Sequence, residues 1–221
     1  MTLSRKSIAF FTVGMLLLLD QASKIYVKLH MMEHTGIPVF GDWFQIFFIE
    51  NEGMAFGMTL GGTFGKLLLT SFRLVFSSFI IYFIYRLVVE QKPKFFIFCC
   101  SLILAGALGN IIDSIFYGVI FSDSSGRIAE WLPAQGYSSW LHGRVVDMLY
   151  FPLFSGIYPD WVPIVGGDEF VFFSFIFNIA DAAISIGIAC LLFFQRHVFT
   201  ETQPTQLDPI AGNATNIEGE I

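Results

Sequence analysis

Four apolar segments, separated by polar stretches that are rich in aromatic residues, set the pattern of the chain. The third segment, Phe95 to Ile112, is a run of 18 uncharged residues, close to the minimum length of a helix that crosses the hydrocarbon core of a bilayer. The other three are of similar length and carry isolated charges. We therefore predict an all-α polytopic membrane protein with four transmembrane helices, over about residues 7–29, 66–89, 95–117 and 171–195.

Lys and Arg residues mark the helix ends that should share one side of the membrane. They are Arg5 and Lys6 before the first segment, Arg86, Lys92 and Lys94 between the second and third, and Arg196 after the fourth. Because loops rich in Lys and Arg stay in the cytoplasm, we expect both termini on the cytoplasmic side of a bacterial inner membrane. No small-x-small cleavage site follows the first apolar run, so we expect this run to be retained rather than removed as a signal peptide.

Two long segments, residues 31–65 and 118–169, then face the extracytoplasmic side. The first contains the strand-like run Trp43 to Ile49 followed by glycines, which predicts a small extracytoplasmic β-sheet on the membrane surface. The second is too long for a plain connection, so we expect an extracytoplasmic cap segment or a short interfacial helix there. Residues 1–199 would form a single membrane-embedded domain, and the polar stretch 200–221 is expected to be a disordered cytoplasmic tail.

The composition agrees with a membrane location and excludes several classes of function. With 55% hydrophobic and 14% charged residues and a mean hydropathy of +0.67, the chain of 221 residues is too apolar for a soluble domain. Much of its formal charge of −6 comes from the loops and the tail, and nothing resembles a nucleic-acid-binding surface. The three cysteines lie in apolar segments and the four histidines are scattered, so neither a disulfide framework nor a metal site is expected.

Asp181 is the most informative charge, because it lies inside the last apolar segment. An ionised aspartate near the centre of a transmembrane helix costs at least about 2.5 kcal/mol, so it requires a partner or a function. Under the predicted topology Asp20, Asp113 and Asp147 lie at the same extracytoplasmic level as Asp181. Two carboxyl groups that share a site push their pKa values apart and provide one base and one acid at neutral pH, as in an aspartic protease.

The sequence lacks the motifs of serine hydrolases and metalloproteases and the features expected of a catalytic cysteine. The chain has no G-x-S-x-G motif, no H-E-x-x-H motif and no obvious environment that would stabilise a cysteine thiolate. Paired carboxylates remain as a complete catalytic set, but intramembrane carboxylates also serve proton- or cation-coupled transporters, and a structural membrane subunit is a third interpretation. Four helices without a recognisable inverted repeat make the transporter the weaker alternative.

Amide residues accompany two of the aspartates. Asn110 precedes Asp113 by three positions and Asn178 precedes Asp181 by three, a spacing that puts each pair on one face of a helix. Each of these aspartates therefore has a neighbouring amide that can orient it or a substrate carbonyl. The small residues around Gly106 allow another helix to approach closely.

Five short motifs occur in a fixed order over residues 20–185. They are Asp20-Gln21-x-x-Lys24, Asn51-x-Gly53-x-Ala55-Phe56, Gly109-Asn110-x-x-Asp113, Val145-Val146-Asp147 and Phe177-Asn178-x-Ala180-Asp181. Together they resemble the lipoprotein signal peptidase family, signal peptidase II. This resemblance, rather than the spacing, makes Asp147 and Asp181 the catalytic dyad. It implies a prolipoprotein substrate whose cysteine already carries diacylglycerol, cleaved on the N-terminal side of that cysteine, and sensitivity to globomycin.

The resemblance also implies roles for the other motif residues. Those expected to bind substrate or to support the dyad are Asn51, Gly53, Asn110, Asp113, Asn178 and Ala180, and Asp20 with Lys24 would organise the helix ends as a local ion pair. No cofactor and no metal are implied. The expected partners are the diacylglyceryl prolipoprotein and membrane lipids, with the enzyme acting as a monomer.

Two departures from the family pattern bear on the site. The family usually has Arg after the aspartate of its third motif, where this chain has Ser114, and Arg144 is a candidate replacement for that cation. The segments between Asp113 and Asp147 and between Asp147 and Asp181 also look longer than in typical members. We therefore expect an elaborated cap.

Overall fold

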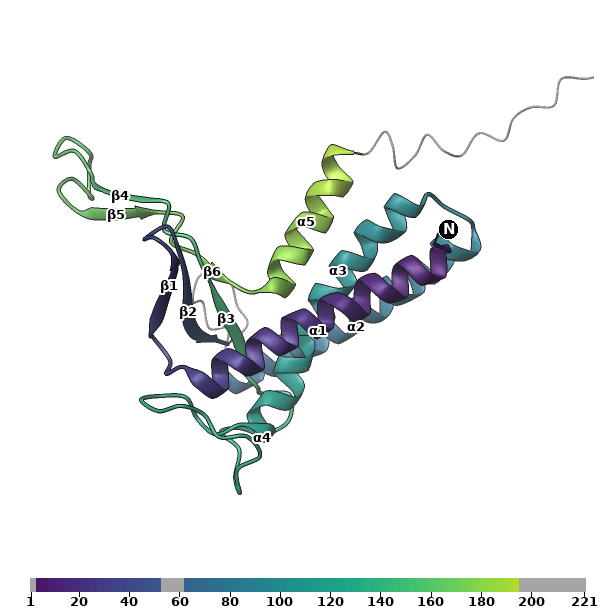
Figure 1. Cartoon of the computed structure of the whole chain (residues 1–221), viewed down its shortest axis with the longest axis horizontal. Helices are drawn as coiled ribbons and strands as arrows, with labels where there is room; N and C mark the ends of the chain where they lie inside the picture. The colour runs from purple at the N-terminus through teal and green to yellow at the C-terminus, as the bar shows by residue number, and fades with distance from the viewer. Residues whose placement is uncertain (1–2, 53–61, 195–221) are drawn as a thin grey trace, which may run out of the picture.

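Three helices are long and apolar enough to cross a membrane in the part of the chain that the computed structural model describes, residues 3–52 and 62–194. They are α1 (Arg5–His30), α2 (Gly62–Val89) and α3 (Lys94–Ile112), which lie side by side (Figure 1). Ser4 starts α1, because its hydroxyl accepts a hydrogen bond from the Ser7 backbone N–H at 3.1 Å. A π-helical turn, η2 (Asp113–Tyr117), and the short α4 (Gly118–Ile120) extend α3.

The predicted fourth span is wrong at its beginning. Its helix, α5 (Ile179–Phe193), has 15 residues, and residues before it form the strands β5 (Glu169–Phe172) and β6 (Ile176–Phe177). Asn178 and Asp181 start α5 with a reciprocal capping box, in which each side chain accepts a hydrogen bond from the other's backbone N–H. Asp181 therefore lies in the first turn of the helix and not near its centre, and Asn178 precedes the helix instead of sharing its face.

A four-stranded antiparallel sheet covers one end of the helices (Figure 1). Its order is β1 (Gly36–Phe40), β2 (Phe44–Asn51), β3 (Val145–Tyr150) and β6. The strand predicted near Trp43 to Ile49 is present as β2. The small sheet was thus foreseen, but β3 and β6 join it from segments that we expected to be cap and transmembrane helix.

The long segment before α5 also contains a hairpin. Strand β4 (Phe154–Ile157) pairs antiparallel with β5, and the hairpin extends away from the four-stranded sheet and from the helices (Figure 1). The other part of the predicted cap, residues 121–144, contains an isolated bridge between Phe121 and Trp131 but no interfacial helix. The elaboration of the cap is therefore a hairpin and a folded loop.

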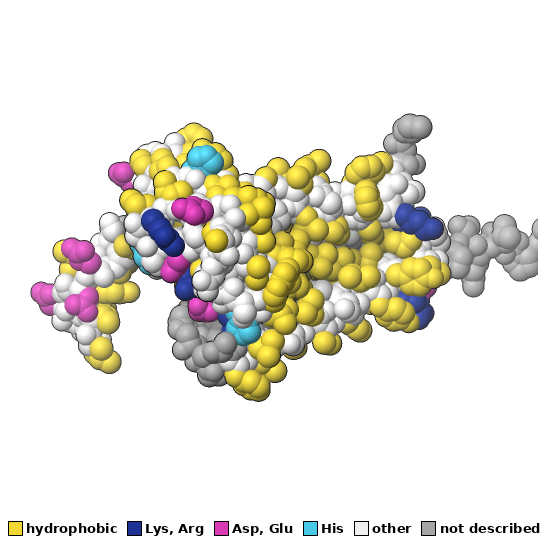
Figure 2. Space-filling view, turned by 90° about the horizontal axis from the view of Figure 1, so that it is seen from below, with side chains coloured by type: hydrophobic (Ala, Val, Ile, Leu, Met, Phe, Trp, Pro, Cys, Tyr) yellow, Lys and Arg dark blue, Asp and Glu magenta, His cyan; other side chains and the backbone are white. Residues whose placement is uncertain are grey.

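Two apolar clusters hold these elements together. One joins the end of α1 to the sheet and includes Val27, Phe48, Tyr117 and Val146; the other lies between α2 and α3. Large apolar side chains elsewhere on the helices are exposed, with Phe10 at 75%, and Figure 2 shows them along the length of the helices. This distribution is that of a multi-pass membrane protein, whose lipid-facing side chains need no cover from the protein.

Candidate active site

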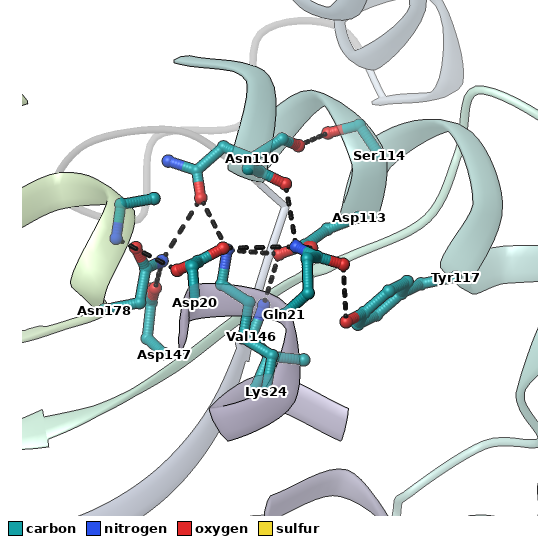
Figure 3. Close-up of polar contacts among 12 residues, drawn as sticks. Asp20, Gln21, Lys24, Asn110, Asp113, Ser114, Tyr117, Val146, Asp147 and Asn178 are labelled. Carbon is teal, nitrogen blue, oxygen red and sulfur yellow. Dashed lines mark hydrogen bonds and ion pairs between the residues drawn. The ribbon is translucent and has the colours of Figure 1, made fainter. Parts of the chain in front are cut away.

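Polar side chains that are almost fully buried meet where α1, α3 and α5 approach the strands β2 and β3 (Figure 3). The buried members are Asp20, Lys24, Asn110, Asp113, Asp147 and Asn178, each at most 5% exposed. They come from α1, α3, η2, β3 and the N-cap of α5, and all had been named from the sequence. Buried charges and amides persist only when they are paired or hydrogen-bonded, so the contacts within this cluster decide what each residue does.

Lys24 forms ion pairs with two of the carboxylates. Its Nζ lies 2.8 Å from Asp20 Oδ2 and 2.8 Å from Asp113 Oδ2, so the predicted pair with Asp20 is present and extends to Asp113. Gln21 closes the group by donating from Nε2 to both carboxylates, at 3.1 and 2.9 Å. Asp20 Oδ1 also accepts the backbone N–H of Ala180 at 2.9 Å, which ties α1 to the start of α5. Asp20 and Asp113 therefore act in fixing the helices.

Asp147 and Asp181 are held by amides. Asn178 donates from Nδ2 to Asp147 Oδ1 at 2.6 Å, and Asn51 donates from Nδ2 to Asp147 Oδ2 at 3.1 Å. Asn110 donates from Nδ2 to Asp181 Oδ1 at 2.8 Å. Among the ion pairs found in the described residues, none involves these two carboxylates. They are thus oriented without being neutralised by a direct ion pair.

The environment of Asp147 favours its protonated form. Burial and, to a smaller extent, the charge of Asp181 raise the pKa of Asp147 to about 7, although the hydrogen bonds from Asn51 and Asn178 act in the opposite direction. Asp181, at the beginning of α5, accepts hydrogen bonds at the end of a helix where the backbone dipole favours a negative charge. The two carboxyl groups therefore have different surroundings, which is the condition for one acid and one base.

Asn110 connects the group around Lys24 to the second pair of carboxyl groups, Asp147 and Asp181. Its Oδ1 accepts from Lys24 Nζ at 2.9 Å and from Asn178 Nδ2 at 3.3 Å, so its Nδ2 is left to donate to Asp181. Lys24 thus fixes the orientation of the Asn110 amide as well as that of the two carboxylates with which it forms ion pairs.

Two glycines allow α3 to approach its neighbours closely, as the sequence predicted near Gly106. A Cβ atom at Gly106 would lie 2.2 Å from the backbone oxygen of Ala180. One at Gly109 would lie 2.6 Å from Asp20 Oδ2. No side chain larger than hydrogen fits at these positions, and this contact brings Asn110 to Asp181.

Arg144, the candidate replacement for the cation of the family's third motif, pairs with Glu50, Glu52 and Asp123, at 3.0, 3.4 and 3.4 Å. Ser114 uses its hydroxyl to donate to the backbone oxygen of Asn110 at 2.9 Å. Gly53 lies outside the described residues.

Sequence reasoning missed three residues at this site. Gln21 donates to both ion-paired carboxylates, and Tyr117 donates from Oη to Gln21 Oε1 at 3.1 Å. The half-buried Arg73 of α2 attracts Asp181, Asp113 and Asp147 electrostatically. Its signal in the sequence was a lone charge within an apolar segment, the same signal that singled out Asp181.

The fold and the cluster define a multi-pass membrane protein with buried carboxylates at one end of its helices. The model of the Peptidase_A8 family, signal peptidase (SPase) II, matches residues 12–196. The chain belongs to the signal peptidase II family.

Individual relatives agree. A lipoprotein signal peptidase of Porphyromonas gingivalis is 53% identical over 185 residues, which cover 81% of this chain and 79% of the relative. One of Amoebophilus asiaticus is 39% identical over 198 residues, covering 88% and 80%. A solved bacterial membrane enzyme shares the fold, with 19% identity, a TM-score of 0.56 and coverage of 90% of this chain and 93% of that one. The resemblance drawn from the five motifs is thereby confirmed, and the transporter alternative is not supported.

Proposed function

We propose that this protein removes signal peptides from diacylglyceryl-modified prolipoproteins as an aspartic endopeptidase, cleaving on the N-terminal side of the lipid-modified cysteine. Family membership supports the substrate class. The aspartic type of catalysis is inferred from the pair Asp147 and Asp181. Both residues form hydrogen bonds with Asn178, and neither carboxylate has a direct ion-pair partner among the described residues. The neighbouring Asp20 and Asp113 are both ion-paired with Lys24, which makes them unsuited to the role.

The chemistry follows from the different surroundings of the two carboxyl groups. Asp181, as the base, takes a proton from a water molecule whose oxygen attacks the scissile carbonyl carbon. Asp147, whose pKa of about 7 leaves it substantially protonated at neutral pH, donates its proton to the carbonyl oxygen. When the tetrahedral intermediate collapses, the C–N bond breaks, the proton taken from water is passed from Asp181 to the leaving amine, and a hydroxyl group of the intermediate returns a proton to Asp147. The hydrogen bonds from Asn51, Asn110 and Asn178 hold the carboxyl groups in place for these transfers.

The charge distribution supports an active site on the extracytoplasmic side. Arg5 lies beside the loop between α2 and α3, donating to Lys92 O at 2.8 Å and to Gln91 Oε1 at 3.0 Å. Figure 2 shows Lys and Arg side chains at this end of the helices, opposite to the sheet. In our proposal this end and both termini are cytoplasmic, α5 completes a fourth crossing, and the site at the other end receives the substrate's acyl chains from the bilayer.

Cleavage of a diacylglyceryl prolipoprotein by the purified protein in detergent, followed as a mass shift, tests the proposal. We expect cleavage by the wild type, inhibition by globomycin, and loss of activity in Asp147→Asn and in Asp181→Asn. Glu90→Gln is the matched control, because Glu90 pairs with Arg86 on the exposed surface at the far end of the helices. Full activity in either aspartate variant, or no cleavage by the wild type, would contradict the proposal.

A further inference from the structure

Five charged side chains of alternating sign form a continuous chain outside the carboxylate cluster. In order they are Lys28 of α1, Glu50 of β2, Arg144 before β3, Glu52 after β2 and Lys66 of α2. Lys28 pairs with Glu50, Arg144 Nη1 lies 3.0 Å from Glu50 Oε2, Arg144 Nε lies 3.4 Å from Glu52 Oε1, and Lys66 Nζ lies 2.6 Å from Glu52 Oε2. We call this set the charge chain. It connects two helices through the ends of two neighbouring strands.

The inner half of the charge chain is fully buried. The side chains of Lys28 and Glu50 are 0% exposed. Ser124 donates to Glu50 Oε1 at 2.9 Å, and Lys28 Nζ lies 4.8 Å from the centre of the Tyr137 ring and 5.3 Å from that of Phe121. Apolar side chains of similar volume are often as stabilising as a buried ion pair, so the pair calls for an explanation beyond stability.

The charge chain lies on the reverse face of the strand pair that carries part of the site. Successive side chains of a strand point to opposite faces, so Glu50 and Glu52 lie on one face of β2 and Asn51 on the other. In the same way Arg144 lies on the face opposite to Asp147, three residues further along the chain. The register pairs Glu50 with Val146 and Asn51 with Val145. Asn51, which donates a hydrogen bond to Asp147 from β2, is thus flanked along the chain by Glu50 and Glu52 of the charge chain.

We propose that Glu50 and Arg144 are positioning residues, whose ion pair fixes the end of β2 against β3 and so keeps Asn51 on Asp147. The inference rests on the proposed function, because it assumes that Asp147 acts in catalysis. The fork of Arg144 suits this role: its Nη1 reaches Glu50 and its Nε reaches Glu52, the two neighbours of Asn51. A lysine at this position would keep the charge but could not span both carboxylates with the same geometry.

A double-mutant cycle tests whether Glu50 acts through Asn51. We expect Glu50→Gln to lower kcat about tenfold with little change in KM, and to have less than a twofold effect in the Asn51→Ala background. Glu90→Gln should leave kcat and KM unchanged, since it removes only the exposed ion pairs of Glu90 with Arg86 and Lys92. A Glu50→Gln variant as active as the wild type, or one whose effect is fully retained in Asn51→Ala, would overturn the proposal.

Arg144 supplies a second test that does not depend on Glu50→Gln being folded. Arg144 is 29% exposed, so we expect Arg144→Gln to fold, as checked by its melting temperature, and to lose kcat as Glu50→Gln does. Arg144→Lys should recover part of the loss. Equal activity of Arg144→Gln and wild type would also overturn the inference. These outcomes differ from those that would contradict the proposed function itself, which are no cleavage by the wild type or retained activity in Asp147→Asn.

Discussion

Asn178 donates from its side chain to Asp147 at 2.6 Å, while its own side-chain oxygen caps the helix that carries Asp181 at 2.9 Å. One amide therefore joins the strand that presents the first aspartate to the helix that presents the second. Because both groups of the amide are engaged, this one side chain links the position of Asp147 directly to that of Asp181. The two roles of Asn178, as the helix cap and as the hydrogen-bond donor to Asp147, can be separated by substitution.

Asn178→Ser should keep the N-cap hydrogen bond to α5 and lose the hydrogen bond to Asp147. A serine hydroxyl can accept the Asp181 backbone N–H as an N-cap, but it cannot also donate to Asp147 as the amide does. We expect kcat to fall about a hundredfold, the loss typical of misplaced reacting groups, with little change in melting temperature. Asn178→Ala should show the same loss of activity and cost about 1 kcal/mol of stability besides, because the cap is lost too. A serine variant with wild-type kcat would show that the link is unimportant.

The pH dependence of cleavage should have an alkaline limb near pH 7. Burial and the charge of Asp181 raise the pKa of Asp147 to about 7, and the proposed mechanism requires its proton. As pH rises through this value Asp147 ionises, both carboxyl groups become negative, and kcat/KM should fall about tenfold per pH unit. Initial rates between pH 5.5 and 9 in one detergent check this. A rate that is constant up to pH 9 would show that the proton of Asp147 is not required.

The same pKa predicts that Asp147 destabilises the folded protein at alkaline pH. Its pKa rises from 3.8 to about 7 on folding, so between these values unfolding releases a proton and the free energy of unfolding falls with rising pH. At about 1.4 kcal/mol per pKa unit, the loss reaches about 4 kcal/mol above pH 7. Asp147→Asn should therefore be more stable than the wild type at pH 8, with the difference shrinking toward pH 4. Thermal unfolding in detergent at the two pH values measures it, and a difference independent of pH would contradict the prediction.

The sequence predicted what depends on local pattern. The three long helices follow from apolar runs, and β2 follows from the aromatic run near Trp43. The predicted beginning of the last helix was wrong, because an apolar run such as Phe170 to Phe177 suits a strand as well as a helix. The pairing of its residues with β4 and β3 is not a local property of the sequence. The capping box of Asn178 and Asp181 was visible in the sequence, but the apolar run concealed its role as a helix start.

Roles within the site depended on contacts between distant residues. Spacing predicted the pair Asp20 and Lys24, but not that Lys24 also forms an ion pair with Asp113, which leaves Asp147 as the partner of Asp181. The charge chain was invisible for the same reason, since 94 residues separate Glu50 from Arg144.

The close contact of α3 with α5 yields the last prediction. A methyl group at Gly106 would lie 2.2 Å from the backbone oxygen of Ala180 and 2.6 Å from Ile184 Cγ1, so Gly106→Ala must displace one helix. Overpacking of this kind costs about 1–3 kcal/mol. Because Asn110 on α3 donates to Asp181 on α5, the displacement should also lower kcat at least tenfold. Gly14→Ala is the matched control: a Cβ there meets nothing within 4 Å, and an alanine favours the helix by about 0.5–1 kcal/mol. Melting temperature and kcat of the two variants, measured together, distinguish a helix contact that the site requires from a general intolerance of the helices to alanine, which would lower both quantities in Gly14→Ala as well.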